Sequence, residues 1–332
     1  MWFGFAFAAY SVVGNDVIQT LGTFLTSNEK SRKWYELWAF AGSIMVAILI
    51  IGYLGMGDYF GLGGNDIAFG RLDKIERVDE LTWHYALPPL VLLGLTRLGI
   101  PVSTTFLILT FFSTKSLPGM VSKSLMGYII AFGVGAILYT LITKATEKKF
   151  LTYPIGTEGH GLWTSRKFWI GAQWFSTAFL WSQWLTQDLA NIYVYLGKDD
   201  MSLMTFIASL VILVGLLGYI FYSKGGKIQD IVRAKTNTGD IRSATFIDLI
   251  YGVVLLIFKQ DILGLWDAKL PMSTTWVFIG LLAGREIAMN FRLHNKMDSS
   301  KLKAIGMDLV KVFLGLAISV VLVFVMKFLI GS

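Results

Sequence analysis

The feature that most constrains this chain is a series of uninterrupted apolar runs. The clearest of them cover residues 35–55, 124–143, 201–222 and 305–330. A helix needs about 20 apolar residues to cross the hydrocarbon core of a bilayer, so each run predicts a membrane-spanning helix. The strict alternation of barrel strands is absent. Because only 15% of the residues are charged, we expect an all-α integral membrane protein in a lipid bilayer.

Two polar motifs interrupt the chain twice, at a nearly constant offset. Gly14-Asn15-Asp16 breaks an apolar run near the start, and Thr186-Gln187-Asp188 breaks another, 172 residues on from Asp16 to Asp188. The segment Pro101-Val102-Ser103-Thr104-Thr105 is matched by Pro271-Met272-Ser273-Thr274-Thr275 at an offset of 170. The pairing predicts an N-terminal repeat (1–146), a cytoplasmic linker (147–167) and a C-terminal repeat (168–332).

Each repeat also contains a pair of apolar stretches that are too short to cross a membrane alone. They are 85–98 with 102–113, and 244–258 with 272–284, and proline stands between the members of each pair. Such lengths are typical of re-entrant segments, and proline is a strong helix breaker. We therefore expect a re-entrant helical hairpin in each half, with Ser103 or a neighbouring hydroxyl residue opening the second half-helix of the first.

Three crossings and one hairpin per half would turn the second half upside down relative to the first. This is the inverted-repeat plan of many secondary transporters. Under this topology the loops of one face hold 18 Lys and Arg and those of the other hold 6. Because Lys and Arg accumulate in cytoplasmic loops, we expect a multi-pass protein of the cell membrane with both termini outside the cytoplasm.

The aspartates of the first repeated motif predict a cation site. Insertion scales put an Asp at a helix centre near +3 kcal/mol, so intramembrane carboxylates are rare and usually functional. An unwound turn would add backbone carbonyls to the oxygens of Asn15, Asp16, Gln187 and Asp188, and such a cage suits Na⁺. A second functional possibility is that the aspartates take up and release protons. A purely structural possibility is that they form hydrogen bonds that pack neighbouring helices. The repetition favours function.

The Ser-Thr-Thr segments predict an oxyanion site. A half-helix that begins at the membrane midplane points its N–H groups and positive dipole end into the protein. Plain helix capping explains one such segment, but two copies favour an anion site shared between the halves. Asp16 and Asp188 would lie beside it and bring cations to the anion. The predicted anion contacts are Ser103, Thr104, Thr105, Ser273, Thr274, Thr275, Asp16 and Asp188.

Other classes of protein fit less well. The net charge of +7 is explained by cytoplasmic loops, so we expect no nucleic-acid partner. The chain has no cysteine, its three histidines are far apart, and no nucleophile–base pair is evident, so we expect neither an enzyme nor a cofactor beyond Na⁺ as coupling ion. A channel fits less well because it would need a continuous polar path through the membrane. The sequence does not decide whether the protein forms a homodimer.

The motif Gly14-Asn15-Asp16-Val17 and the segment Gly99-Ile100-Pro101-Val102-Ser103-Thr104-Thr105 resemble those of the inorganic phosphate transporter (PiT) family. That family has both motifs in two inverted halves, with both termini outside. The resemblance implies uptake of phosphate coupled to Na⁺ or H⁺. It also implies cation contacts at the Asn-Asp and Gln-Asp pairs and oxyanion contacts at the two Ser-Thr-Thr segments.

The chain departs from the family pattern in four places. Phe106 and Trp276 stand where the family has His after Ser-Thr-Thr, and Gln187 replaces the second Asn. The family's Glu ahead of a Gly-Ser pair is also absent, since Gly42-Ser43 follows Ala39-Phe40-Ala41. The family includes sulfate permeases. We therefore expect a divergent member whose substrate is phosphate, with sulfate as the alternative.

Overall fold

The computed structural model describes residues 2–76, 81–98, 102–142, 152–157, 161–196, 201–224, 240–294 and 299–330. Within these ranges the regular secondary structure is helical. Five of the described helices are long and apolar enough to cross a membrane, and four of them match the predicted spans. These candidate spans are Trp34–Tyr53, Thr114–Leu141, Leu203–Tyr222, Ile241–Gln260 and Ile305–Val325. The one that was not predicted, Ile241–Gln260, contains the stretch 244–258, which was predicted to be too short to cross alone.

The connections between the longer elements range from direct continuation to the long loop that follows Trp34–Tyr53. In chain order they are α1 (Trp2–Val12), the π-helical η1 (Val13–Val17), α2 (Ile18–Asn28), α3 (Trp34–Tyr53), α4 (Leu87–Arg97), α5 (Thr104–Phe112), α6 (Leu117–Ile142), α8 (Arg166–Asp188), α9 (Ala190–Tyr193), α10 (Leu203–Tyr222), α12 (Ile241–Gln260), α13 (Thr274–His294) and α14 (Ser299–Ile330). Short 3₁₀ turns, η2 (Trp83–Ala86), η3 (Thr114–Ser116) and η5 (Gly161–Trp163), lie before α4, α6 and α8.

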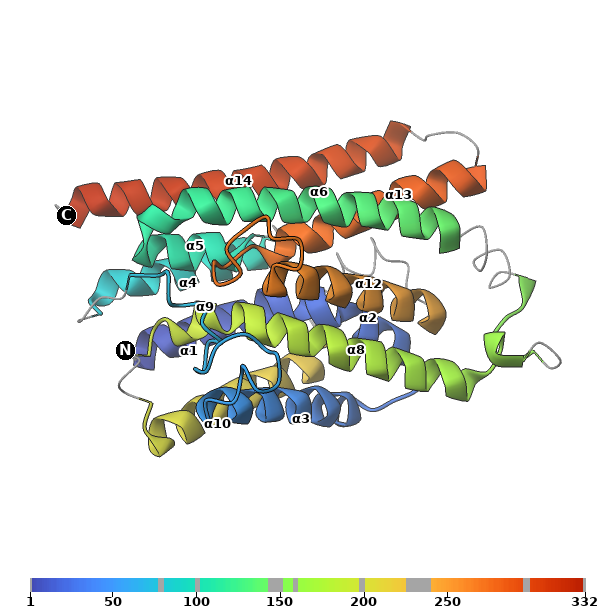
Figure 1. Ribbon diagram of the computed structural model, residues 1–332, viewed down its shortest axis with the longest axis horizontal. Helices are drawn as coiled ribbons and strands as arrows, with labels where there is room; N and C mark the ends of the chain where they lie inside the picture. The colour runs from blue at the N-terminus through green and yellow to red at the C-terminus, as the bar shows by residue number, and fades with distance from the viewer. Residues whose placement is uncertain are drawn as a thin grey trace.

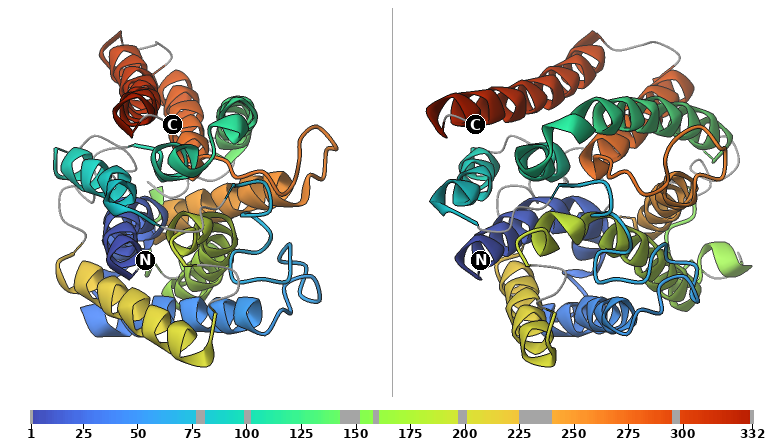
Figure 2. Two further views of the ribbon diagram at one scale, coloured as in Figure 1. Left: turned by 90° about the vertical axis from the view of Figure 1, so that its left-hand side faces the viewer. Right: turned by 60° about the vertical axis from the view of Figure 1, so that its left-hand side comes forward.

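The long helices run roughly parallel to one axis of the molecule, and both termini lie at the same end (Figure 1). Helices α3 and α10 pack together on one side, and α6, α13 and α14 form the other side (Figure 2). Between these layers lie α1, α2, α8 and α12. The first polar break lies between α1 and α2, and the second lies at the end of α8. The polar motifs therefore sit in the centre of the bundle.

The segments predicted as the second hairpin are longer than expected. Helix α12 covers 20 residues and α13 covers 21, against the predicted stretches 244–258 and 272–284. The side chain of Asp240 accepts a hydrogen bond from Arg242 N and begins α12 ahead of its apolar part, and the positive φ of Asp261 (47°) ends it. Apolar length alone missed these polar end turns.

The first predicted hairpin keeps its short helices. Helix α4 has 11 residues and α5 has 9, and the two pack against each other. The predicted tip, Gly99-Ile100-Pro101, lies outside the described residues. The hydroxyl of Ser103 accepts a hydrogen bond from Phe106 N and caps α5, as the sequence predicted.

Both polar breaks stay helical instead of unwinding. Residues Val13–Val17 widen into one turn of π-helix between α1 and α2, and their flanking residues keep right-handed helical angles. In the second break, Leu189 separates α8 from α9 with φ −56° and ψ −28°, which are also helical values. The expected unwound carbonyls are therefore replaced by a π-bulge in the first half, a device found frequently at functional sites.

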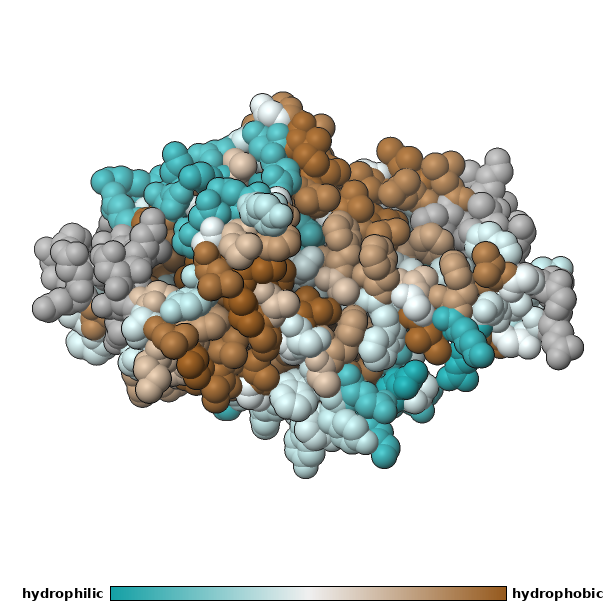
Figure 3. Space-filling model, turned by 60° about the horizontal axis from the view of Figure 1, so that its bottom comes forward, coloured by the Kyte–Doolittle hydropathy of each residue, from teal (hydrophilic) through white to brown (hydrophobic). Residues whose placement is uncertain are grey.

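The outer surface of the bundle is largely apolar. Exposed large side chains are frequent along α10 and α14, where Met204 is 78% exposed and Phe328 87%. On the face drawn in Figure 3, hydrophobic residues occupy the middle and hydrophilic ones gather toward upper left and lower right. Such a surface fits contact with lipid tails.

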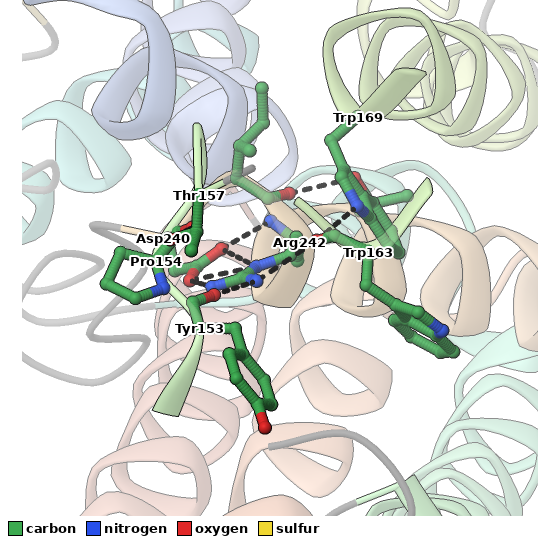
Figure 4. A network of polar contacts seen from close by, with 9 residues as sticks. Tyr153, Pro154, Thr157, Trp163, Trp169, Asp240 and Arg242 are labelled. Atoms are coloured by element: carbon green, nitrogen blue, oxygen red, sulfur yellow. Dashed lines mark hydrogen bonds and ion pairs between the residues drawn. The ribbon is translucent and has the colours of Figure 1, made fainter. Parts of the chain in front are cut away.

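The described part of the linker is tied to α12 by a buried arginine. The guanidinium of Arg242 donates to the carbonyls of Tyr153 (3.1 Å) and Trp163 (3.2 Å) and to both carboxylate oxygens of Asp240 (Figure 4). Its side chain is 1% exposed, so the charge is paired where it is removed from water.

Candidate functional site

The two Ser-Thr-Thr segments, far apart in sequence, meet at the centre of the bundle. Thr105 Oγ1 lies 3.2 Å from the carbonyl oxygen of Met272, to which it can donate a hydrogen bond. The rings of Phe106 and Trp276 pack edge to face with centroids 5.4 Å apart. The amino ends of α5 and α13 therefore face a common region, and first-turn N–H groups have no partner within their own helix.

Asp16 is held by the side chains around it. Asn15 Nδ2 donates to Asp16 Oδ1 (2.7 Å) and to the carbonyl of Val102 (2.9 Å), just ahead of α5. Thr104 Oγ1 donates to Asp16 Oδ2 over 2.5 Å. Asp16 is 1% exposed, and these bonds satisfy both of its carboxylate oxygens.

Asp188 belongs to the same network through Asn191. Asn191 Nδ2 lies 3.0 Å from Asp188 Oδ1 and 3.0 Å from Thr104 Oγ1, the hydroxyl that also binds Asp16. Thr105 Oγ1 is 3.3 Å from Asp188 Oδ1. The two carboxylates of the two halves are thus joined by one asparagine and the two threonines of the first segment.

Several buried polar atoms of this network lack a hydrogen-bond partner among the described residues. They are Asn15 Oδ1, Asp188 Oδ2, Asn191 Oδ1 and both amide atoms of Gln187. Most are oxygens, and oxygen ligands are those preferred by hard cations. We call the group formed by Asn15, Asp16, Thr104, Thr105, Gln187, Asp188 and Asn191 the central site.

The predicted site residues are all buried, but they do not have the same surroundings. Ser273 caps α13 by accepting from Trp276 N at 3.3 Å, as Ser103 caps α5. The carbonyl of Thr274 accepts a hydrogen bond from Tyr251 OH at 3.0 Å. Thr104 and Thr105 form hydrogen bonds with the aspartates, whereas the two serines accept hydrogen bonds from backbone N–H groups.

A third buried carboxylate, Asp248 on α12, escaped the sequence analysis. Thr23 on α2 donates to its Oδ1, and Thr177 on α8 donates to its Oδ2 at 2.6 Å. A signal was present: Asp16, Thr20 and Thr23 are spaced by four and three residues, which places polar groups on one face of α2. That stripe continues the polar character of the central site along the α2–α8 contact.

A cavity of about 480 Å³ lies at the far end of this contact. It is lined by Ser27, at the end of α2, and by Arg166, Asp240 and Arg242, and by none of the predicted site residues. Within the described ranges no group of three or more His, Asp or Glu side chains could hold a metal ion. The central site is recognised by its buried hydrogen-bond network.

Comparison with known proteins identifies the fold of this chain. No family model matches the chain, and no curated protein matches it. A solved structure described as "The sodium-dependent phosphate transporter" superposes with a TM-score of 0.63, covering 98% of this chain and 98% of that chain at 16% sequence identity. The resemblance seen in the motifs is thereby confirmed at the level of the fold: over nearly its whole length, this chain has the fold of a sodium-dependent phosphate transporter.

Proposed function

We propose that this protein is a secondary active transporter that imports inorganic phosphate together with Na⁺. It would work by alternating access about the central site, between two inverted repeats with re-entrant hairpins. The proposal rests most on one observation: the amino ends of α5 and α13 meet beside two buried aspartates that Thr104, Thr105 and Asn191 link into one network. The fold shared with a sodium-dependent phosphate transporter supports it.

The central site has the chemistry for both ions. Helix amino ends and threonine hydroxyls donate hydrogen bonds to a tetrahedral oxyanion. Carboxylate and amide oxygens coordinate a cation, and the cation offsets the anion's charge where the dielectric constant is low. Binding one ion therefore favours binding the other, which is the requirement for symport.

Na⁺ fits the central site better than a proton does. A proton site needs only a carboxylate, whereas this site also presents the amide oxygens of Asn15, Gln187 and Asn191 without partners in the described chain. Buried amide oxygens are costly unless they are bound, and a Na⁺ ion would satisfy several at once. We therefore favour Na⁺ as the coupling ion.

The hydrogen bonds also suggest an order of binding. In this structure the hydroxyls of Thr104 and Thr105 are directed at Asp16 and Asp188. A cation on those carboxylates would compete for the same oxygen lone pairs and release the hydroxyls to donate to the oxyanion. Na⁺ would thus prepare the anion site, and phosphate affinity should rise with Na⁺ concentration.

Phosphate is favoured over sulfate because of the neighbouring carboxylates. At neutral pH phosphate retains a proton that it can donate to a carboxylate, and sulfate has none. With Asp16 and Asp188 bonded to the threonines of the anion site, only a protonated anion gains from their proximity.

The direct test is uptake of labelled phosphate into proteoliposomes containing the purified protein. An imposed Na⁺ gradient and, separately, a pH gradient identify the coupling ion, and unlabelled sulfate serves as competitor. We expect accumulation that depends on the Na⁺ gradient and resists sulfate. Accumulation of sulfate instead, or phosphate flux without gradient-driven accumulation, would contradict the proposal.

A further inference from the structure

A second group of buried charges lies outside the central site, around the loop between α12 and α13. Arg71, in the loop that follows α3, is 2% exposed, Lys123 on α6 is 2% exposed, and Lys259 near the end of α12 is 3% exposed. We call these three residues the cationic cluster. Burying three cations together is costly unless each is paired.

Arg71 connects the members of the cationic cluster. Its guanidinium donates to the carbonyl of Ala268 and lies 3.4 Å from that of Lys259 and 3.5 Å from that of Thr186. Lys123 Nζ donates to the same Ala268 carbonyl at 3.2 Å. Because Thr186 precedes Gln187 and Asp188, the cluster borders the central site.

The three cations differ in how far they are satisfied. Lys123 Nζ also donates to the carbonyls of Asp267 (2.9 Å) and Leu270 (2.7 Å), so its donors fix the loop ahead of α13. Arg71 still has an N–H on each terminal nitrogen beyond its three bonds. Lys259 Nζ is buried and donates to no atom of the described chain, although lysines in a last helical turn commonly cap carbonyls.

Four carboxylates lie close enough to act on the cationic cluster, namely Asp188 of the central site, Asp66, Asp261 and Asp267. The last three are engaged elsewhere. Asp66 accepts from the backbone N–H groups of Ala68 and Gly70, and Asp261 accepts from that of Leu265. Asp267 pairs with Lys74 at 3.3 Å. Among the described residues, no carboxylate lies within ion-pair distance of Arg71, Lys123 or Lys259.

Arg242 shows what a satisfied buried cation looks like in this protein. It is as buried as Arg71, but both oxygens of Asp240 receive its N–H groups (Figure 4). Arg71 has carbonyl partners only, and burial lowers its pKa to about 10, which leaves it charged at neutral pH. Arg71 therefore carries positive charge that no ion pair in the described chain neutralises.

Exposed contacts close the loops over this cluster. Lys269 Nζ is 2.7 Å from Asp73 Oδ2, and Gln260 Nε2 donates to the carbonyl of Gly61 at 2.5 Å. These contacts join the loop after α3 to the loop before α13, which project on the same side of the molecule (Figure 2). The sequence predicts the loop after α3 on the extracytoplasmic face.

We propose that Lys259 and Arg71 form a second oxyanion site, beneath the loop between α12 and α13, that binds a phosphate group. The ammonium and the remaining guanidinium N–H groups supply charge-assisted hydrogen bonds, and Lys123 positions the loop that covers the anion. The phosphate comes either from free inorganic phosphate or from a lipid headgroup. The binding of a phosphate group here does not depend on the proposed function. Only the inference that this site lies on the route of a transported anion rests on it.

The test measures binding of labelled inorganic phosphate to the purified full chain in detergent. We compare wild type with Lys259→Met and with Lys303→Met, a matched control at an exposed position of α14, away from the cluster. Removing a charged hydrogen bond of about 1.5–3 kcal/mol should weaken this site at least tenfold in Lys259→Met, and the control should bind as wild type does. Removing an unpaired buried charge should also leave the variant at least as thermally stable as wild type.

Two further arms identify the source of the phosphate and separate this proposal from the transport function. Phosphorus in an organic extract of the purified protein, lost in Lys259→Met, identifies a lipid headgroup. In Asp188→Asn, which disables the central site, the second site should still bind phosphate and should lose it on adding Lys259→Met. The proposal is overturned if Lys259→Met equals wild type in both inorganic phosphate and lipid phosphorus, whatever the uptake assay gives.

Discussion

The two polar breaks resemble each other in sequence and differ in how their polar atoms are satisfied. In the first, the carboxylate of Asp16 has partners on both oxygens, and Asn15 uses its amide hydrogens on Asp16 and Val102. In the second, Gln187 has no hydrogen bond at either amide atom, and Asp188 has one carboxylate oxygen without a partner in the described chain. Asn15 Oδ1 is the one side-chain oxygen of Asn15 and Asp16 without a partner among the described residues, whereas Gln187 and Asp188 leave three atoms without one, so the second break retains more unused binding capacity.

This difference indicates which half of the central site responds to a ligand. A buried hydrogen-bonded network resists change because breaking it leaves polar groups without partners. A buried polar group without a partner destabilises the empty state and gains most when an ion arrives. We therefore expect substitutions in the first break to act mainly on stability and those in the second to act mainly on ion binding.

The largest effect should come from Asp188→Asn. Losing the negative charge removes the cation's strongest ligand in the second break, so Na⁺-driven phosphate uptake should fall about a hundredfold, the equivalent of about 3 kcal/mol. Initial uptake rates in proteoliposomes measure this. Asp267→Asn, an exposed carboxylate on the α12–α13 loop, is the control and should retain uptake. Unchanged coupled uptake in Asp188→Asn would remove Asp188 from the cation site.

Next in size is Asn15→Leu, which removes the two hydrogen bonds that Asn15 donates in the first break. It leaves Asp16 Oδ1 and the carbonyl of Val102 without their donor in the interior, at a cost of about 3 kcal/mol in the free energy of unfolding. Thermal unfolding in detergent should show a clearly lowered midpoint. An unchanged midpoint would mean that the first break is no more constrained than the second.

Substitutions of the two threonines in the first Ser-Thr-Thr segment allow the two breaks to be compared within one helix turn. Thr104 bonds to Asp16 at 2.5 Å and Thr105 reaches Asp188 at 3.3 Å. Thr104→Val should therefore cost about 2 kcal/mol of stability and Thr105→Val about 1 kcal/mol, since only the former loses a short bond to a charged group. Matched thermal melts of the two variants check the order, and a larger loss in Thr105→Val would reverse the comparison.

Much of this arrangement was predictable from the sequence. Apolar length predicted four of the long helices but not the full lengths of α12 and α13, whose polar end turns it missed. The repeated motifs predicted that Asp16, Asp188 and the Ser-Thr-Thr segments belong together, because a charge inside a membrane needs partners. Asp248 was missed because it stands in an apolar run with no second copy. The cationic cluster was missed because Arg71, Lys123 and Lys259 are distant in sequence and meet only through the α12–α13 loop.

The smallest effect on stability, and the one with the opposite sign, should come from Gln187→Leu. Both amide atoms of Gln187 lack partners in the described chain, so an apolar side chain of similar size should raise the free energy of unfolding by about 1 kcal/mol. The same change removes an oxygen from the proposed cation site and should weaken the Na⁺ dependence of phosphate binding about tenfold, which a Na⁺ titration of that binding measures. Asn15→Leu lowers stability where Gln187→Leu raises it. If both variants lose stability equally, the two breaks are equivalent and the second holds no unused ligand.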